Sequence, residues 1–581
     1  MRSFLLEELQ RLKERKWAEN DKTDQVQIFN LCSKKLREEF VSHTITDWAK
    51  PDNKLEFYSA EAQKIHKSIF EMMVMDLRPF TTVNDPGFLQ HHALIKSSFV
   101  LASDKYYREQ LDPNYQKVKN IIKSIIEQDN PKTISLSLDG WSAMHHGYLG
   151  VNITYLSHWR RKQFNIACTP FDERHTGINI YETITAIAED WDIASKVNVV
   201  LRDNAANMKC AFSQPGCTWT DVGCLNHGLN LVIQEDLLKM PSIKSVIKKC
   251  KEISAHCNQS NVFYNQLMAE QEILMPGKEK LSLKNDCPTR WNSTHDMLLR
   301  FEKLRPALIS TLSQCDNLDV ELTSSDFKLI NRIVTVLENF NSATKMLSKS
   351  DASISQAIPI VTTIMEDLHC SRKAEDHGVK SLKKSLLSSM EERFDCYEDD
   401  ETYTIATLLD PRYRTWFFRK TSTVENVTEC IKDRLYEELS NSANEANNTS
   451  SSSSNSEEKD GFAQRMHAIY KKNKLKSNPV GEDKILKKEI EMTVYDYCKE
   501  SPAENAFNYW KERASSSNLV IQAMAKMAEI YLTPSPTTTD VERLFSTAGD
   551  IITNERNRLL PATAEKLLFL RENFPKINFN Y

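Results

Sequence analysis

The sequence predicts a mostly α-helical protein with one small α/β core that a long all-helical insertion interrupts. Residues 133–203 show the two-residue alternation typical of strands, whereas residues 241–502 show almost only helical periodicity. A strongly amphipathic helix then follows near the end of the chain. The expected organisation is a helical region at 1–130, the first part of the core at 131–240, the insertion at 241–502 and the completion of the core at 503–581.

Length and composition indicate an intracellular protein. The 581 residues exceed what one ordinary core holds, and 40% hydrophobic with 27% charged residues is typical of a soluble protein. No apolar run is long enough to span a bilayer, and Glu7 and Glu8 interrupt the first apolar stretch, so neither a membrane partner nor a secretory signal is expected. The 13 cysteines are expected to be reduced thiols.

The net charge of −5 restricts how the chain could bind nucleic acid. An acidic average repels the phosphate backbone, so any DNA contact must come from local basic patches. Only Cys32 precedes Cys168, so a zinc finger that needs two cysteine ligands cannot form in the N-terminal region.

The core begins with three strands, a helix and a fourth strand. The predicted strands cover residues 134–138, 148–155, 164–168 and 197–201, and the helix covers 178–190. The first strand is expected to stop at Asp139, and Asp203 follows the last one. If the helical crossover makes the fourth strand parallel to the first, both carboxylates lie at the same edge of the sheet, where ligands bind in open α/β sheets.

Two carboxylates at one sheet edge suit Mg²⁺ or Mn²⁺, which can activate an attacking oxygen and stabilise a leaving oxygen of a phosphodiester. The alternative is that Asp139 and Asp203 only form the turns at their strand ends. Cys210, Cys217, Cys224 and His227 could in principle hold zinc, but their gaps differ from the short spacing of structural sites, so a structural zinc is not expected.

The insertion is predicted to be helical, with a disordered loop. Residues 440–461 are polar and of low complexity, and such a segment cannot bury a core. The sheet is expected to resume only near Tyr509 and Trp510.

The last amphipathic helix carries a third carboxylate. Val541, Leu544 and Phe545 fall on one helical face, and Thr539 with Glu542 has the spacing of a capping box. Glu542 is therefore either a helix cap or a partner of the upstream carboxylates. A second apolar helix follows with Leu567 and Leu568, and both helices must bury their apolar surface on the body of the protein or on another copy.

Six short motifs follow one another along the chain: LDGWS (138–142), RDNAANM (202–208), CLNH (224–227), TRWNS (289–293), LLDPRYR (408–414) and VERLFSTAG (541–549). In this order they resemble the motifs of the hAT superfamily of DNA transposases. The resemblance extends from about Gln63 to Phe574 and is greatest to transposase-derived proteins that carry a BED-type zinc finger.

The resemblance implies an RNase H-like core split by the helical insertion. Asp139, Asp203 and Glu542 match the family's acidic triad, which binds two divalent cations, Mg²⁺ or Mn²⁺, to cleave and join DNA strands. Cys224 and His227 match its CxxH signature. Arg290 and Trp291 match its RW signature, in which the Trp supports a flipped nucleotide. Stacking on an aromatic ring makes that role reasonable, and core packing of Trp291 is the alternative.

The resemblance also implies a dimer in the nucleus, with DNA as a partner and no small-molecule substrate. The C-terminal block looks like the family's dimerisation region, whose apolar residues are Val541, Leu544, Phe545, Ile551, Leu567 and Leu568. Two departures from the family pattern stand out. Arg202 occupies a position where Thr is usual, and the BED finger is absent, so the chain is either truncated or has lost that module.

Three functions follow from these observations. The preferred hypothesis is a dimeric, transposase-derived nuclear protein that binds DNA or regulates transcription without catalysis. The alternative is an active transposase that performs metal-dependent strand cleavage and transfer. A third is a helical interaction scaffold in which the triad is a relic.

Overall fold

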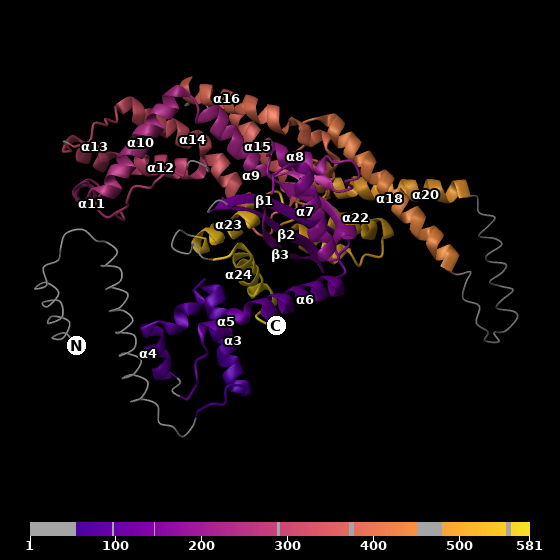
Figure 1. Ribbon diagram of the computed structural model, residues 1–581. Coiled ribbons are helices and arrows are strands. Elements are labelled where there is room, and N and C mark those ends of the chain that lie inside the picture. The colour runs from indigo at the N-terminus through magenta and orange to yellow at the C-terminus, as the bar shows by residue number, and fades with distance from the viewer. Residues whose placement is uncertain are drawn as a thin grey trace, which may run out of the picture. The chain divides into compact units, whose positions relative to one another are not determined.

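The computed structural model describes residues 54–581 except for 96–97, 144–145, 288–290, 316, 371–376, 450–478 and 553–558. The described residues form two compact units, one from 54–120 with 566–581 and one within 121–565. Helices dominate both units, and a single mixed sheet lies in the described part of the second (Figure 1). A mostly α protein with one small sheet is therefore confirmed.

The first unit joins the two ends of the described chain. Its helices are α3 (Ala60–Met75), α4 (Pro86–Ile95) and α5 (Asp104–Glu109), with parts of α6 (Leu111–Asp129) and α24 (Pro561–Asn573). Lys67 Nζ donates hydrogen bonds to the carbonyls of Phe579 and Tyr581 at 3.0 and 3.3 Å. The ring of Tyr115 meets that of Phe569 at 4.7 Å. Residues at opposite ends of the sequence thus share one small core.

The sheet of the second unit has the order β3-β2-β1-β4-β5. β1 (Ile134–Ala143), β2 (His146–Ser157) and β3 (Arg160–Pro170) form an antiparallel meander; β4 (Val197–Arg202) and β5 (Thr220–Gly223) are parallel to β1. The crossover between β1 and β4 includes α7 (Gly177–Asp190), and α8 (Ala206–Phe212) connects β4 to β5. The expected parallel pairing of the first and fourth strands is confirmed.

Three expectations about the sheet need correction. β1 does not stop at Asp139, because its pairing with β2 continues to Ala143. β5 was not predicted, since its four residues are too short to show a two-residue alternation. The sheet does not resume at Tyr509: both predicted residues lie in α21 (Ala506–Arg513), and no strand follows Gly223 among the described residues. The apolar side chains there pack on other helices instead.

Most of the described helices between β5 and α23 (Thr539–Ile551) pack around two hydrophobic clusters. One cluster involves α9 (Leu225–Leu231), α10 (Pro241–Gln259), α11 (Asn261–Leu274), α12 (Trp291–Lys303), α13 (Arg305–Ser313), α14 (Ser324–Leu347), α15 (Ala357–His369) and α16 (His377–Phe394). The other involves α17 (Glu401–Leu409), α18 (Thr421–Thr449), α20 (Pro479–Lys499), α21 and α22 (Leu519–Tyr531). α14 starts sharply because Thr323 and Asp326 form a capping box.

The structure describes only the first part of the loop at 440–461 that the sequence predicts to be disordered. α18 continues as a helix to Thr449, so it covers the first ten positions of that segment. The remaining positions lie outside the described residues.

Arg161 connects the edge strand β3 to the segment that precedes α23 (Thr539–Ile551). Its buried guanidinium donates hydrogen bonds to the carbonyls of Leu532, Thr533 and Pro534, to the carbonyl of Ala352 and to the hydroxyl of Ser535. The two terminal nitrogens make all of these bonds, because the planar donor fork of arginine reaches several acceptors at once. The described helices include none that is long and apolar enough to cross a membrane.

Candidate functional site

Asp139 on β1 and Asp203, which directly follows β4, occupy matching positions along two neighbouring parallel strands. Ser137 of β1 aligns with Leu201 of β4, and each Asp lies two residues further along. Both therefore lie toward the carboxyl edge of the sheet, as the sequence predicted. The Asp139 carboxylate accepts a hydrogen bond from the Gly140 amide at 3.0 Å, and Asp203 accepts one from the Ala205 amide at the same distance.

The hydrogen bonds of the Asp139 and Asp203 carboxylates test whether these residues only form turns at the ends of their strands. Asp203 does form a local turn, because its carboxylate holds the backbone at the start of α8. Asp139 does not end its strand, since it pairs with Gly150 inside the β1–β2 ladder. A turn-forming role thus describes Asp203 and does not describe Asp139.

α23 crosses the sheet directly over the Asp139–Gly150 pair. A Cβ atom on Gly150 would lie 2.5 Å from Val541 Cγ1 and 2.8 Å from Phe545 Cζ, so only glycine permits this approach. Phe545 also stacks on Trp141 of β1, with centroids 5.7 Å apart. Because Asp139, Trp141 and the cross-strand partner of Asp139 share one face of the sheet, Asp139 lies on the α23 face. Glu542 follows Val541 directly and therefore lies on the helix that covers this face.

The start of α23, the helix of Glu542, also lies near the end of β5, because the Thr538 amide donates a 3.4 Å hydrogen bond to the thiol of Cys224. The charge of Glu542 contributes to the raised pKa of the Cys224 thiol, which is about 11 chiefly because the thiol is buried. The Cys224 amide donates a 2.7 Å hydrogen bond to the carbonyl of Arg202, the residue before Asp203. The three carboxylates thus belong to adjoining elements at one end of the sheet.

The predicted capping box at the start of α23 is wrong. The N-cap is Thr538, and its side chain makes no capping hydrogen bond. The hydroxyl of Thr539 instead bonds to Asn226 Nδ2 at 3.2 Å and to the hydroxyl of Thr537 at 2.9 Å. The Thr539 hydroxyl thus contacts α9 and does not cap its own helix. Glu542 is therefore not part of a capping box with Thr539.

The carboxylates suit a hard divalent cation by their chemistry, because Mg²⁺ and Mn²⁺ prefer oxygen ligands. The described residues nevertheless contain no group of three His, Cys, Asp or Glu side chains close enough together to hold a metal ion. The structure therefore brings the elements that carry Asp139, Asp203 and Glu542 together without gathering the three side chains into one ligand set.

Arg202 supports the loop that carries Asp203, a role that the sequence did not reveal. Its guanidinium forms a bidentate pair with Asp221 of β5, at 2.8 and 2.6 Å, and donates to the carbonyl of Asp203 at 2.8 Å and to Asn204 Oδ1 at 3.2 Å. The side chain is almost fully buried. Arg202 thus fixes the loop through contacts that the usual Thr is too short to make.

Cys224 helps join α9 to the segment before α23, and His227 contacts Cys224 through its backbone amide. The buried Cys224 thiol accepts hydrogen bonds from the backbone amides of Thr538, at 3.4 Å, and of His227. Cys210 is exposed and Cys217 is partly exposed. The structure assigns Cys224 to packing between these elements.

Trp291 is a core residue of the insertion. It is 2% exposed, begins α12 and packs edge-on against His295 with centroids 5.9 Å apart. Its backbone amide donates to Asn230 Oδ1 at 3.2 Å. This burial supports core packing over a base-stacking role, while Arg290 lies outside the described residues.

The six residues expected to form the dimer surface are buried within a single chain. Every one is at most 7% exposed within a single chain, so none presents a free apolar surface: Val541, Leu544, Phe545, Ile551, Leu567 and Leu568. The sequence correctly indicated that their helices bury much apolar area. It could not distinguish burial within one chain from burial against another copy.

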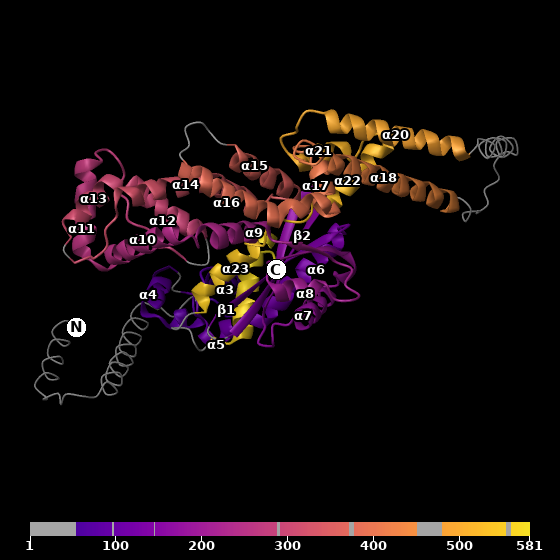
Figure 2. The ribbon, with the colours of Figure 1, turned by 90° about the horizontal axis from the view of Figure 1, so that it is seen from above.

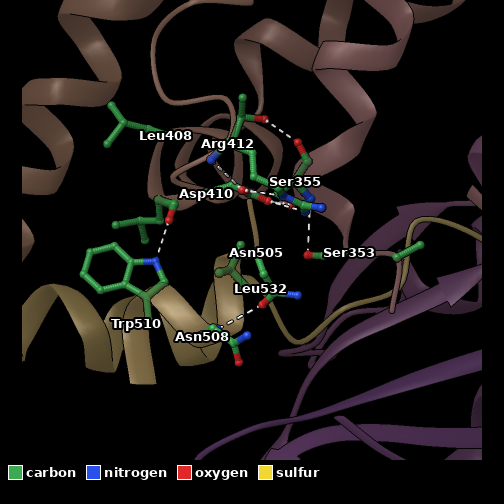
Figure 3. A network of polar contacts seen from close by, with 12 residues as sticks. Ser353, Ser355, Leu408, Asp410, Arg412, Asn505, Asn508, Trp510 and Leu532 are labelled. Atoms are coloured by element: carbon green, nitrogen blue, oxygen red, sulfur yellow. Dashed lines mark hydrogen bonds and ion pairs between the residues drawn. The ribbon is translucent and has the colours of Figure 1, made fainter. Parts of the chain in front are cut away.

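The LLDPRYR motif forms a buried polar junction (Figure 3). The Asp410 carboxylate accepts hydrogen bonds from Arg412 at 2.9 and 2.7 Å and from the Ser355 hydroxyl at 2.7 Å. The Trp510 indole donates to the Leu409 carbonyl at 2.8 Å. Arg414 donates to the carbonyls of residues 500 and 501. The motif thus joins the short 3-10 helix η5 (Ile354–Gln356), α17 and α21.

A pocket of about 420 Å³ lies on the other face of the β1–β2 hairpin. Its lining includes Ser142, His146, Asp172 and His175, with His146 Nδ1 3.1 Å from the Asp172 carboxylate. Ser142 pairs with Gly147, and the Cβ direction of Gly147 points at His175. The pocket is therefore separate from the α23 face.

Two family comparisons match this chain. Residues 222–336 match the ZBED1 RNase-like helical domain, and residues 487–574 match the hAT family C-terminal dimerisation region. The chain is 24% identical over 557 residues to human "Zinc finger BED domain-containing protein 4", covering 91% of this chain and 45% of that protein. It is 23% identical over 562 residues to the maize "Putative AC transposase", covering 90% and 67% respectively.

A third relative is the Drosophila melanogaster "Transposable element Hobo transposase", 24% identical over 349 residues, which are 55% of this chain and 50% of that protein. The chain spans about half the length of the human and mouse BED proteins that it matches.

Proposed function

We propose, on the premise that this chain is a transposase-derived protein of the hAT family with the family's dimerisation region, that it works in the nucleus as a dimer that binds DNA. The observation that carries the proposal is the match at residues 487–574 in a chain whose similarity to BED proteins and transposases extends over about nine tenths of its length. Regulation of transcription is the expected use of such binding, since one relative is named "Putative transcriptional regulator tpeD".

Binding of a labelled duplex by the purified full chain tests this proposal. Fluorescence anisotropy at several salt concentrations should show binding that weakens steeply as salt rises, because neutralised phosphates release counterions. Light scattering behind size exclusion should give the mass of a dimer. A chain that is monomeric and binds no duplex even at low salt would contradict the proposal. Microscopy of a tagged chain checks the nuclear location.

The second candidate is an active transposase with an RNase H-like core. The passage of α23 over the Asp139–Gly150 pair favours it, because this contact brings the helix of Glu542 to the strand of Asp139. Asp139, Asp203 and Glu542 would hold Mg²⁺ or Mn²⁺, which would supply charge stabilisation to a phosphodiester under attack. Of this chain's own groups, Arg202 would hold the Asp203 loop in position.

Cleavage of a labelled duplex in Mn²⁺ distinguishes the two candidates. The wild-type chain is compared with Asp203→Ala and with the control Glu189→Ala, which changes an exposed carboxylate on α7. Cleavage by the wild type and the control, and not by Asp203→Ala, would make the transposase function primary. Binding without cleavage by all three would support the non-catalytic dimer.

A further inference from the structure

α20 is apolar on two opposite faces. Its inner face is buried through Ile490, Val494 and Tyr497, each at most 4% exposed, which pack in one cluster with residues of α18. α18 and α20 lie side by side in both views (Figures 1 and 2). A helix that only covered α18 would need no second apolar stripe, because its outer face meets water.

The outer face of α20 exposes three large apolar side chains. Ile485 is 69% exposed, Met492 57% and Tyr495 56%. Their spacing of seven and then three residues places them along one side of the helix. Single exposed apolar residues are ordinary on protein surfaces, whereas an aligned row marks a surface for another partner. We call these three residues the α20 stripe.

The family comparison indicates which partner covers the α20 stripe. Met492 and Tyr495 lie inside the matched dimerisation region, and Ile485 lies two residues before it. The residues first expected to form the dimer are buried within one chain. The described large apolar residues that are exposed in the matched region are Met492, Tyr495, Leu519 and Leu560. Half of them belong to the stripe.

The charges of α20 indicate the direction in which two copies would pair. Between residues 484 and 496 the exposed lysines come first and the exposed carboxylates follow: Lys484, Lys487 and Lys488, then Glu489, Glu491 and Asp496. The exposed Asp483 and Lys499 at the two ends have the opposite sign, but the first half keeps an excess of exposed lysines and the second half an excess of exposed carboxylates. Two parallel copies would place like charges side by side. Two antiparallel copies, related by a twofold axis, place the lysine half of each helix against the acidic half of the other.

We infer that the α20 stripe is a contact between two copies of this chain, in which the two α20 helices run antiparallel across a twofold axis. The inference deepens the proposed function and rests on its dimer. Ile485 and Met492 lie seven residues apart, so in this arrangement the Ile485 of one copy faces the Met492 of the other.

The test uses the full chain and compares three proteins by light scattering and sedimentation equilibrium. The double variant Ile485→Glu/Met492→Glu should raise the dimer dissociation constant roughly tenfold or more, because it places four carboxylates in an apolar contact. The control Leu519→Glu changes an equally exposed residue of the matched region on α22, and it should leave the dimer intact. Circular dichroism and the thermal midpoint confirm that each variant is folded.

Charge exchange tests the antiparallel direction. Lys484→Glu alone should weaken the dimer, and Lys484→Glu/Glu491→Lys should restore it. Failure of the second change to restore the dimer overturns the antiparallel arrangement. A wild-type dimer that survives Ile485→Glu/Met492→Glu overturns the α20 contact, with another segment or protein covering the stripe, and leaves the proposed function standing. A monomeric wild type overturns both.

Discussion

Asp410 is fully buried, and its carboxylate accepts hydrogen bonds from the backbone amide and guanidinium of Arg412 and from the Ser355 hydroxyl. A buried carboxylate is costly to desolvate unless such donors surround it. Asp410 in turn raises the pKa of Arg412. Burial disfavours the charged guanidinium, but the hydrogen bonds and the charge of Asp410 outweigh that effect. The LLDPRYR motif is thus visible in the sequence, but its partner Ser355 lies 55 positions upstream, and no local spacing reveals it.

Asp410→Ala should lower the free energy of unfolding by about 3 kcal/mol, because Arg412 and Ser355 lose their shared partner in a buried junction. Urea unfolding of the variant beside the wild type measures the loss. Asp410→Ala/Arg412→Ala provides the control, since the double change should cost clearly less than the sum of the single changes. Additive losses would contradict a direct interaction.

At the scale of the element, α23 is fixed to the sheet by close contact with β2. The sequence predicted the apolar face of this helix because its periodicity is strong, and the residues of that face are indeed buried. It missed the start of the helix, because Thr539 bonds to Asn226 of α9 and not to the helix itself. A local capping pattern cannot show that a distant element competes for the same hydroxyl.

Gly150→Ala should lower the thermal midpoint, with a loss of about 1–3 kcal/mol, because the added methyl group would overlap Val541 and Phe545. The matched control is Gly549→Ala on α23 itself, where nothing lies within 4 Å of the new Cβ. Alanine there should be neutral or stabilising by up to about 1 kcal/mol, since it favours helix over glycine. Equal effects of the two changes would refute the close approach.

The end of α6 is held to β2 and β3 through Asp129. Its carboxylate accepts hydrogen bonds from Tyr155, Ser157 and Lys162 at 2.8, 2.9 and 2.6 Å. Burial alone would raise the pKa of Asp129, but these bonds and the charge of Lys162 lower it overall. The stabilisation is therefore present above the unfolded-state pKa and is lost as pH falls through the lower folded-state pKa.

Asp129→Asn should cost about 2 kcal/mol near pH 7, because bonds to a charged acceptor become bonds to a neutral one. The difference in stability between this variant and the wild type should become smaller only below about pH 4. Thermal midpoints from pH 7 down to pH 3.5 measure this difference. If the thermal midpoints of the two proteins differed by the same amount at every pH, the charge of Asp129 would not contribute to stability.

At the scale of the whole molecule, strand pairing was easier to predict than side-chain assembly. The β1–β4 pairing followed from one rule about helical crossovers, and with it the shared edge of Asp139 and Asp203. The burial of Trp291 and of the six supposed dimer residues could not be predicted, since an apolar stripe has the same pattern whether it meets its own chain or another. The role of Arg202 depends on β5, which is too short to recognise.

Dimer formation should make the stability of the chain depend on its concentration. If only the folded chain dimerises, mass action predicts a higher thermal midpoint at 20 μM than at 0.2 μM. Differential scanning fluorimetry across this range measures the shift, and the Ile485→Glu/Met492→Glu variant should show none. An equal shift in that variant would show that the concentration dependence comes from a contact other than the α20 stripe.

The contacts of Arg161 also determine when the protein can finish folding during its synthesis. The carbonyl of Leu532 that Arg161 binds lies 371 residues later in the chain, and α23, which covers β1 and β2, is later still. A ribosome that adds about 5–20 residues per second needs roughly 20–70 s to synthesise the chain from Arg161 to Leu532. The five described strands are made before then, while β1 and β2 still lack the cover of α23. The nascent chain should therefore depend on chaperones until residue 551 has emerged.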